Sequence, residues 1–375
     1  MNRLLALQAC GQSYWLDNLT RHMIVSGDLV RRIRDEGLRG ITANPTTFGQ
    51  ALSGDDYDDD ILELSKQGLT TKEIYDRLLV ADVQHACDLL LGVHQDTHRL
   101  DGYVSLEVSP HMAHDPQGTM REARRYAAAV NRPNLLIKIP GTRKGVAAIE
   151  QMLYEGVSIN VTLLFSVASY QAVMEAFLSA LERRLAEGQP LESVMSVASF
   201  FLSRIDVLVD HLLGQHTVGG EDSAAARLRG RAAIANAKLA YQPFKQMTAG
   251  ERWQRLAQNG ARVQRPLWAS TGTKNLAYRD VCYVEPLIGR DTINTMPEQT
   301  IEAFADHGEV RPDTIEEQVD EAKVTARELN DLGIGLDYVA WQLEHEGIQK
   351  FVDAYDAALT ALDLKRRQML SQAAA

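Results

Sequence analysis

The chain has 375 residues and a formal net charge of −11, with 45% hydrophobic and 24% charged residues. These proportions are ordinary for a soluble globular protein. The negative charge argues against broad binding to nucleic acid or to a membrane surface, although it leaves room for a local basic pocket.

The sequence offers no pattern typical of a disulfide framework, a metal site or a membrane protein. The three cysteines are scattered and form no C-x-x-C pair. His111 and His114 have no third metal ligand nearby in the sequence, so we expect no metal. No apolar run approaches the ~18 residues of a membrane span. The N-terminal apolar run, Leu4 to Leu7, is too short for a signal peptide, so we expect a cytoplasmic protein.

Eight short runs rich in apolar and β-branched residues alternate along the chain with segments of helical periodicity. This alternation favours a parallel sheet, most simply one closed as a (β/α)8 TIM barrel. An open doubly wound sheet is the alternative, but it would usually carry a Gly-rich dinucleotide loop after its first strand, and none is present. The predicted strands cover residues 12–18, 40–45, 103–110, 134–140, 157–165, 193–201, 265–271 and 291–297.

Two groups of extra helices interrupt the alternation, one between the second and third strands and one at the C-terminus. The first opens at the acidic run 55–60 and continues in a long helix after Thr70. We expect residues 1–375 to form a single barrel domain with a C-terminal helical extension over about 314–375. Other predicted features are a flexible break at 219–223 and helices over 224–247, 276–288, 314–331, 336–345 and 346–371.

The fourth predicted strand, NLLIKIP, contains Lys138 among apolar residues. A lysine is almost never fully buried unless it is paired. It could lie at the strand end and extend its amine to water. Alternatively, the amine is held in an apolar site, where desolvation lowers its pKa from about 10.4. A neutral amine in such a site can attack a carbonyl and form a Schiff base.

Polar side chains also lie near the other predicted strand ends, which is where (β/α)8 enzymes carry their working residues. Each one is weak evidence, because strand-end Asn, Asp and Ser often only cap the next helix. Two carboxylates converging on one lysine are harder to explain in that way, and they favour a catalytic site. The strand-end residues are Asp17, Asn44, Glu107, Lys138, Asn160, Thr162, Ser199, Ser270 and Asn294.

A family resemblance runs in order from about Trp15 to Pro297, through YWLDNLTR, ITANPTTF, SLEVSP, LIKIPGT, INVTLLFS, WASTGTKN and DTINTMP. These runs resemble those of transaldolase, in particular its longer bacterial subfamily. The resemblance implies a (β/α)8 fold with no metal and no organic cofactor. It also implies transfer of a dihydroxyacetone unit from sedoheptulose 7-phosphate to glyceraldehyde 3-phosphate in the pentose phosphate pathway, which gives erythrose 4-phosphate and fructose 6-phosphate. The partners would be sugar phosphates, and the protein would be a monomer or a homodimer.

The resemblance also implies a role for each matching residue. Lys138 is the Schiff-base lysine, and Asp17 takes the general acid/base position. Glu107 and Thr162 match the pair that orients the water used in forming and hydrolysing the imine. The groups that hold the hydroxyls of the three-carbon unit match Asn44, Asn160 and Ser199, and the phosphate clamp matches Arg204 and Ser270.

Two positions bear on how the site differs within the family. Where many transaldolases carry a second phosphate-binding arginine, this chain has a longer turn, and Lys274 could replace that arginine as a point charge. Glu107 and Phe201 match the family's transferases, whereas related fructose 6-phosphate aldolases carry glutamine and tyrosine there. An aldolase that releases dihydroxyacetone remains the nearest alternative, and a non-catalytic sugar-phosphate-binding protein is a more distant one.

Overall fold

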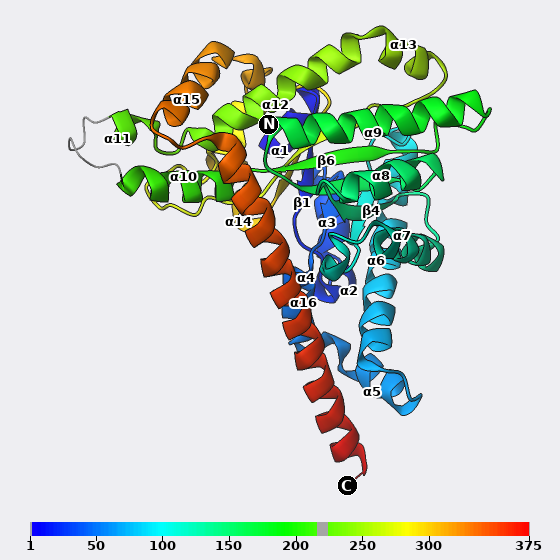
Figure 1. Ribbon diagram of the computed structural model, residues 1–375. Coiled ribbons are helices and arrows are strands. Elements are labelled where there is room, and N and C mark those ends of the chain that lie inside the picture. The colour runs from blue at the N-terminus through cyan, green and yellow to red at the C-terminus, as the bar shows by residue number, and fades with distance from the viewer. Residues whose placement is uncertain (1, 216–223, 375) are drawn as a thin grey trace.

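The computed structural model describes residues 2–215 and 224–374 and contains a closed barrel of eight parallel strands (Figure 1). Each strand pairs with its neighbours in sequence order, and the eighth pairs with the first. This confirms the predicted (β/α)8 barrel, and every observed strand falls within its predicted range. The strands are β1 Gln12–Leu16, β2 Gly40–Thr42, β3 Tyr103–Glu107, β4 Leu135–Pro140, β5 Ile159–Leu164, β6 Ser196–Phe201, β7 Arg265–Ala269 and β8 Thr292–Met296.

Helices surround the barrel and connect its strands. Short non-α turns also occur: a π-helix at Arg32–Glu36 and 3-10 helices at Asp55–Tyr57, Pro110–Met112, Glu285–Leu287 and Thr314–Glu316. The α-helices are α1 Arg3–Ala9, α2 Arg21–Val25, α3 Asp28–Arg31, α4 Pro45–Leu52, α5 Asp58–Lys66, α6 Thr71–Asp96, α7 Pro116–Val130, α8 Gly145–Tyr154, α9 Val167–Ala186, α10 Ser203–Gln215, α11 Ala224–Leu228, α12 Ala232–Ala249, α13 Glu251–Gln258, α14 Glu298–His307, α15 Val319–Asp331 and α16 Leu336–Ala374.

Several of the predicted helices differ from those observed. Residues 276–288 form turns and a 3-10 helix instead of an α-helix. Tyr278 and Tyr283 in this segment donate hydrogen bonds to Asp210 and Asp206 of α10, and these tertiary contacts hold an irregular backbone. The helix predicted over 224–247 is divided into α11 and α12, and the break contains Gly230 at φ +67°. The predicted break at 219–223 lies outside the described residues.

In the C-terminal extension, the two helices predicted over 336–345 and 346–371 form one long helix, and α15 covers most of the helix predicted over 314–331. Helix α16 has 39 residues and contacts α4, α5, α6, α10 and β5. Figure 1 shows it as the orange-to-red helix that passes the barrel and α4 before ending at the C-terminus. No helix within residues 2–215 and 224–374 is both long enough and apolar enough to cross a membrane.

A buried polar network lies at the amino ends of the strands, opposite the end that carries Lys138. The guanidinium of Arg265 donates to Asp101 at 3.1 Å and to Ser13 at 2.7 Å, and it is 5% exposed. Ser13 and Trp15 also donate to Asp101, at 2.6 and 3.1 Å. The network satisfies most of the polar atoms of these residues, although Arg265 Nε has no partner among the described residues, and it joins β1 and β7 to Asp101, two residues before β3.

We expect Arg265→Met to reduce the free energy of unfolding strongly, because it leaves the Asp101 carboxylate buried without its cation. Removing one partner of a buried ion pair typically costs about 3–5 kcal/mol. The matched control is Arg252→Met, whose ion pairs with Glu175 and Glu182 are surface-exposed and should contribute about 1 kcal/mol or less. Urea unfolding curves measure both, and equal losses would contradict the importance of the network.

Candidate active site

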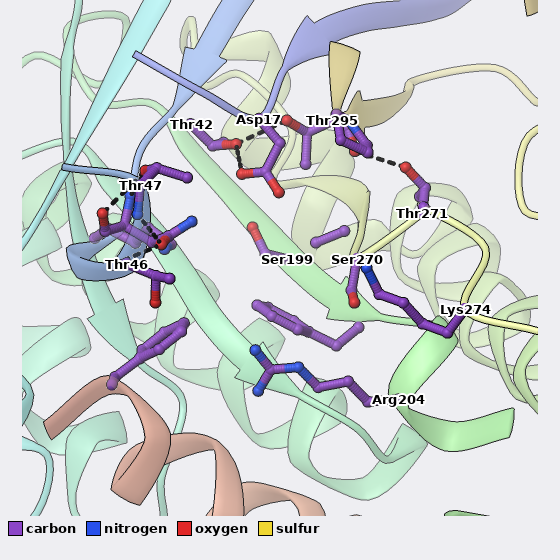
Figure 2. A pocket seen from close by; sticks show the side chains of 17 residues that line it. Asp17, Thr42, Thr46, Thr47, Ser199, Arg204, Ser270, Thr271, Lys274 and Thr295 are labelled. Carbon is purple, nitrogen blue, oxygen red and sulfur yellow. Dashed lines mark hydrogen bonds between the residues drawn. The ribbon is translucent and has the colours of Figure 1, made fainter. Parts of the chain in front are cut away.

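A cavity of about 250 Å³ opens at the carboxyl ends of the strands. Most of the residues predicted from the sequence line it, from five strands or the loops that follow them: Asp17, Asn44, Lys138, Ser199, Arg204, Ser270 and Lys274. Glu107, Asn160 and Thr162 do not line the cavity, and all three are buried. Figure 2 shows Asp17 on one side of the cavity and Arg204 and Lys274 reaching into it from another.

Lys138 is buried and paired, so the interpretation that it extends to water is wrong. Its Nζ donates to Glu107 Oε2 at 2.7 Å and to the Ala43 carbonyl at 3.3 Å, and the residue is only 4% exposed. The barrel register explains the pairing, because Glu107 of β3 lies opposite Lys138 of β4. Side chains at the same level of neighbouring parallel strands point to the same face, so the two charges meet inside the barrel.

Glu107 has one oxygen on the lysine and one without a protein partner. Burial raises the pKa of Glu107, and the positive charge of Lys138 opposes this shift. Its Oε1 and the hydroxyl of Thr162 are both buried, and neither has a hydrogen-bond partner within the described part of the chain. Buried polar atoms normally have a partner, which can be water. Each of the two atoms therefore has a hydrogen bond free for a water molecule.

Asp17 is the second carboxylate, and a threonine pair orients it. Thr42 Oγ1 donates to Asp17 Oδ1 at 2.8 Å, and Thr42 and Thr295 are joined through their hydroxyls at 2.7 Å. A hydroxyl has a single proton, so Thr295 must donate to Thr42 when Thr42 donates to Asp17. Burial raises the pKa of Asp17, whereas Lys138 and the Thr42 hydrogen bond act to lower it. Asp17 can therefore exchange a proton nearer to neutral pH than an ordinary aspartate.

The other end of the cavity is cationic. Arg204, in the first turn of α10, has a buried Nη1 with no partner among the described residues. Its guanidinium lies 5.4 Å from the ring centre of Phe201 and 5.6 Å from that of Phe351. Lys274 also lines the cavity. An unpartnered guanidinium beside a second cation suits a phosphate group.

Ser270 lies in this cationic end with an unusual backbone conformation. Its φ is +55°, which is a left-handed conformation that costs about 1–3 kcal/mol when the residue is not glycine. Its hydroxyl is hydrogen bonded to that of Ser203 at 2.9 Å, and its carbonyl accepts from the Ser203 backbone at 3.0 Å. These bonds link the turn after β7 to the start of α10, and so they fix Ser270 beside Arg204.

The asparagine predictions have different outcomes. Asn44 lines the cavity and also caps α4 by accepting from the Thr46 and Thr47 backbone at 3.0 and 3.2 Å. Asn160 donates to Ser105 at 2.9 Å and accepts from Ser199 at 2.7 Å, so it orients the Ser199 hydroxyl. The prediction for Asn294 is wrong, because this residue lies within β8 and donates to the Tyr283 carbonyl, away from the cavity.

Several lining residues were not identified from the sequence. Thr42 lies two positions before Asn44, a period-two signal that could have indicated an inward-facing hydroxyl, whereas Thr295 adjoins Asn294 and therefore faces the cavity when Asn294 does not. Phe351 comes from α16, and no local pattern in that helix indicates a site. Within residues 2–215 and 224–374, no group of three or more His, Cys, Asp or Glu residues could hold a metal ion.

The fold and the site define a (β/α)8 barrel with a buried lysine and two carboxylates at the carboxyl ends of its strands. The family model described as transaldolase/fructose-6-phosphate aldolase matches residues 14–362. A "Transaldolase 2" of Nostoc sp. is 47% identical over 97% of this chain and 98% of its own length. Proteins named "Transaldolase" from Thiobacillus denitrificans and Trichodesmium erythraeum are 45% and 44% identical, over 96% and 98% of this chain and 100% and 98% of their own lengths. The chain belongs to the transaldolase/fructose-6-phosphate aldolase family.

We expect inorganic phosphate to stabilise the protein through Arg204. A ligand that binds only the folded state stabilises it by about 2.7 kcal/mol at about 100 times Kd. Phosphate should therefore raise Tm in the wild type and in the surface variant Arg252→Met, but much less in Arg204→Met. In Lys274→Met the phosphate-induced rise in Tm should be intermediate, since a lysine contributes a single point charge whereas an arginine can bind phosphate through two N–H groups at once. Equal shifts in all four proteins, measured by thermal denaturation, would exclude Arg204 as the anion site.

Proposed function

We propose that the protein is a transaldolase of the non-oxidative pentose phosphate pathway. It transfers a dihydroxyacetone unit from sedoheptulose 7-phosphate to glyceraldehyde 3-phosphate, through a Schiff base on Lys138. The observation that carries this proposal is the buried pair of Lys138 and Glu107 at the strand ends, in a chain whose near full-length relatives are named transaldolases. The enzyme works in the cytoplasm as a single 1–375 domain, as a monomer or a homodimer.

The cavity orients the ketose phosphate between its cationic and acidic ends. Arg204, Ser270 and Lys274 hold the phosphate, which supplies the partner that the buried Arg204 Nη1 lacks. Asn44 and Ser199 hold the hydroxyls of the three-carbon unit near the lysine, and Asn160 contributes by orienting the Ser199 hydroxyl. This arrangement brings the substrate carbonyl to Nζ and the C4 hydroxyl to Asp17.

Imine formation begins with a proton transfer, because an ammonium has no lone pair with which to attack a carbonyl. Glu107, 2.7 Å from Nζ and with a raised pKa, accepts that proton. The amine then adds to C2 of the ketose, and the former carbonyl oxygen departs as water. Glu107 and Thr162 orient this water as it leaves and again when the imine is hydrolysed.

The protonated imine withdraws electrons from the C3–C4 bond. Asp17 removes the C4 hydroxyl proton as that bond breaks, a contribution typically worth about 10²–10⁴-fold in rate. The aldose phosphate leaves, and the three-carbon enamine stays bound to Lys138. A second aldose phosphate then accepts the unit by the reverse steps, so the kinetics are ping-pong.

A fructose 6-phosphate aldolase that releases dihydroxyacetone is the second candidate. Phe201 favours transfer, because it lines the cavity at 7% exposure and offers no hydroxyl that could help to protonate the enamine. Glu107 favours transfer as well, since related fructose 6-phosphate aldolases carry a glutamine at that position and a tyrosine in place of Phe201.

A two-substrate assay tests the proposed function. With fructose 6-phosphate and erythrose 4-phosphate, the protein should form sedoheptulose 7-phosphate rapidly, and with fructose 6-phosphate alone it should release little dihydroxyacetone. Borohydride should trap a covalent adduct on the wild type and none on Lys138→Ala. If dihydroxyacetone is released as fast as it is transferred, the protein is an aldolase. The absence of an adduct on the wild type would favour a non-catalytic binding protein. An adduct on Lys138→Ala would exclude Lys138 as the Schiff-base residue.

The pH dependence should report on Asp17, which must be ionised to accept the hydroxyl proton. Activity is therefore present above the pKa of Asp17 and is lost as the pH falls through it. Thr42→Val removes a hydrogen bond that lowers this pKa, so the acidic limb of kcat/KM should move to higher pH. Thr42→Ser keeps the hydroxyl and should leave the limb in place. An unchanged limb in Thr42→Val would show that another group controls it.

A further inference from the structure

Phe351 brings the C-terminal helix into the catalytic cavity. It lies on α16, is 4% exposed, and lines the cavity with Lys138 and Arg204. Its ring centre is 5.5 Å from Lys138 Nζ and 5.6 Å from Arg204 Cζ. The ring therefore occupies space next to both the covalent lysine and the phosphate-binding arginine. In Figure 2 the faint reddish ribbon of α16 passes along the edge of the cavity.

A glycine one turn before Phe351 lets the helix approach the barrel this closely. A Cβ at Gly347 would lie 3.1 Å from Leu163 Cδ2 and 3.3 Å from Arg204 Nη1, which is closer than most such contacts.

Farther along α16, polar contacts fix the helix to the helical segment between β2 and β3 and to the loop after β3. Asp363 accepts from Thr71 at 2.7 Å, Asp356 contacts His111 at 2.8 Å, and Lys365 donates to the Gly54 carbonyl. The position of Phe351 is thus set by contacts on both sides of it.

We propose that Phe351 determines whether the enzyme transfers or releases the three-carbon unit, by keeping water away from the enamine on Lys138. The proposal rests on the proposed function and deepens it. A closed apolar wall protects a reactive intermediate from hydrolysis. Lys138 has only 4% exposure, and the Phe351 ring is one of the groups that cover it.

Release and transfer consume different reactants. In release, the enamine carbon takes a proton to give an iminium, water adds to the C=N carbon, and the C–N bond breaks. The products are free dihydroxyacetone and the lysine amine. In transfer, the enamine carbon instead bonds to the aldehyde carbon of the acceptor, whose oxygen takes the proton. Both routes end with hydrolysis of an imine by the water that Glu107 and Thr162 orient. Additional water at the lysine while the enamine waits promotes only release, so its exclusion favours transfer.

The test compares Phe351→Ala with Phe351→Leu, which keeps an apolar wall, and with Trp341→Ala. Trp341 is an aromatic residue on the same helix that is 57% exposed and lies outside the cavity. The measured quantity is the rate of dihydroxyacetone release from fructose 6-phosphate alone, divided by the rate of transfer to erythrose 4-phosphate. We expect this ratio to rise at least about tenfold in Phe351→Ala. A tenfold rise corresponds to a change of about 1.4 kcal/mol in the barrier for release relative to the barrier for transfer. It should rise little in Phe351→Leu and not in Trp341→Ala.

The remaining outcomes separate this inference from a structural effect and from the proposed function. If Phe351→Ala lowers both rates equally, the residue has only a packing role and the inference is wrong. If the wild type itself releases as fast as it transfers, the proposed function fails, whatever the variant does. Gly347→Ala supplies a second test if Phe351→Ala does not fold. Its added methyl should displace α16 from Leu163 and Arg204, so the ratio should rise, and an unchanged ratio in a folded protein would overturn the inference.

Discussion

The site depends on one buried ion pair, that between Lys138 and Glu107, whose side chains are 5% and 3% exposed. Taking two charges out of water is unfavourable, and their attraction offsets this only with good geometry and further hydrogen bonds. Neighbouring parallel strands supply that geometry by placing the two residues at one level, and the Ala43 carbonyl supplies a further acceptor. In the proposed mechanism, the pair keeps the nucleophile and its proton acceptor in contact before any substrate arrives, so no rearrangement is needed for the first proton transfer.

The two ends of the barrel divide stability and chemistry between them. At the amino ends, Arg265 and Asp101 belong to a buried hydrogen-bonded network that joins strands of the barrel. Buried polar atoms without a partner in the described part of the chain occur at both ends, among them Arg265 Nε at the amino ends and Glu107 Oε1 and Arg204 Nη1 at the carboxyl ends. Only the carboxyl ends bring such atoms next to the cavity that Lys138 and Arg204 line, where a ligand or water can bind them.

Much of the fold and the candidate site could be predicted from the sequence, for physical reasons. Strands buried on both faces read as apolar runs, so their positions were clear, and Lys138 was conspicuous among its apolar neighbours. Phe351 could not be predicted, since its role comes from where a distant helix packs. The helix expected over 276–288 was wrong because Tyr278 and Tyr283 bond to α10, a tertiary effect that overrides local periodicity.

The two additions to the barrel, which are far apart in the sequence, form one accessory layer. Helix α16 packs on α4, α5 and α6, and its polar side chains form hydrogen bonds with Thr71 and with the Gly54 carbonyl, both in the helical segment between β2 and β3. Because Asn44 caps the start of α4 and α16 carries Phe351, this layer contributes to the cavity from both of its parts. Substitutions on the facing surfaces of these two distant segments should therefore be energetically coupled, and the coupling reaches the residues of the cavity.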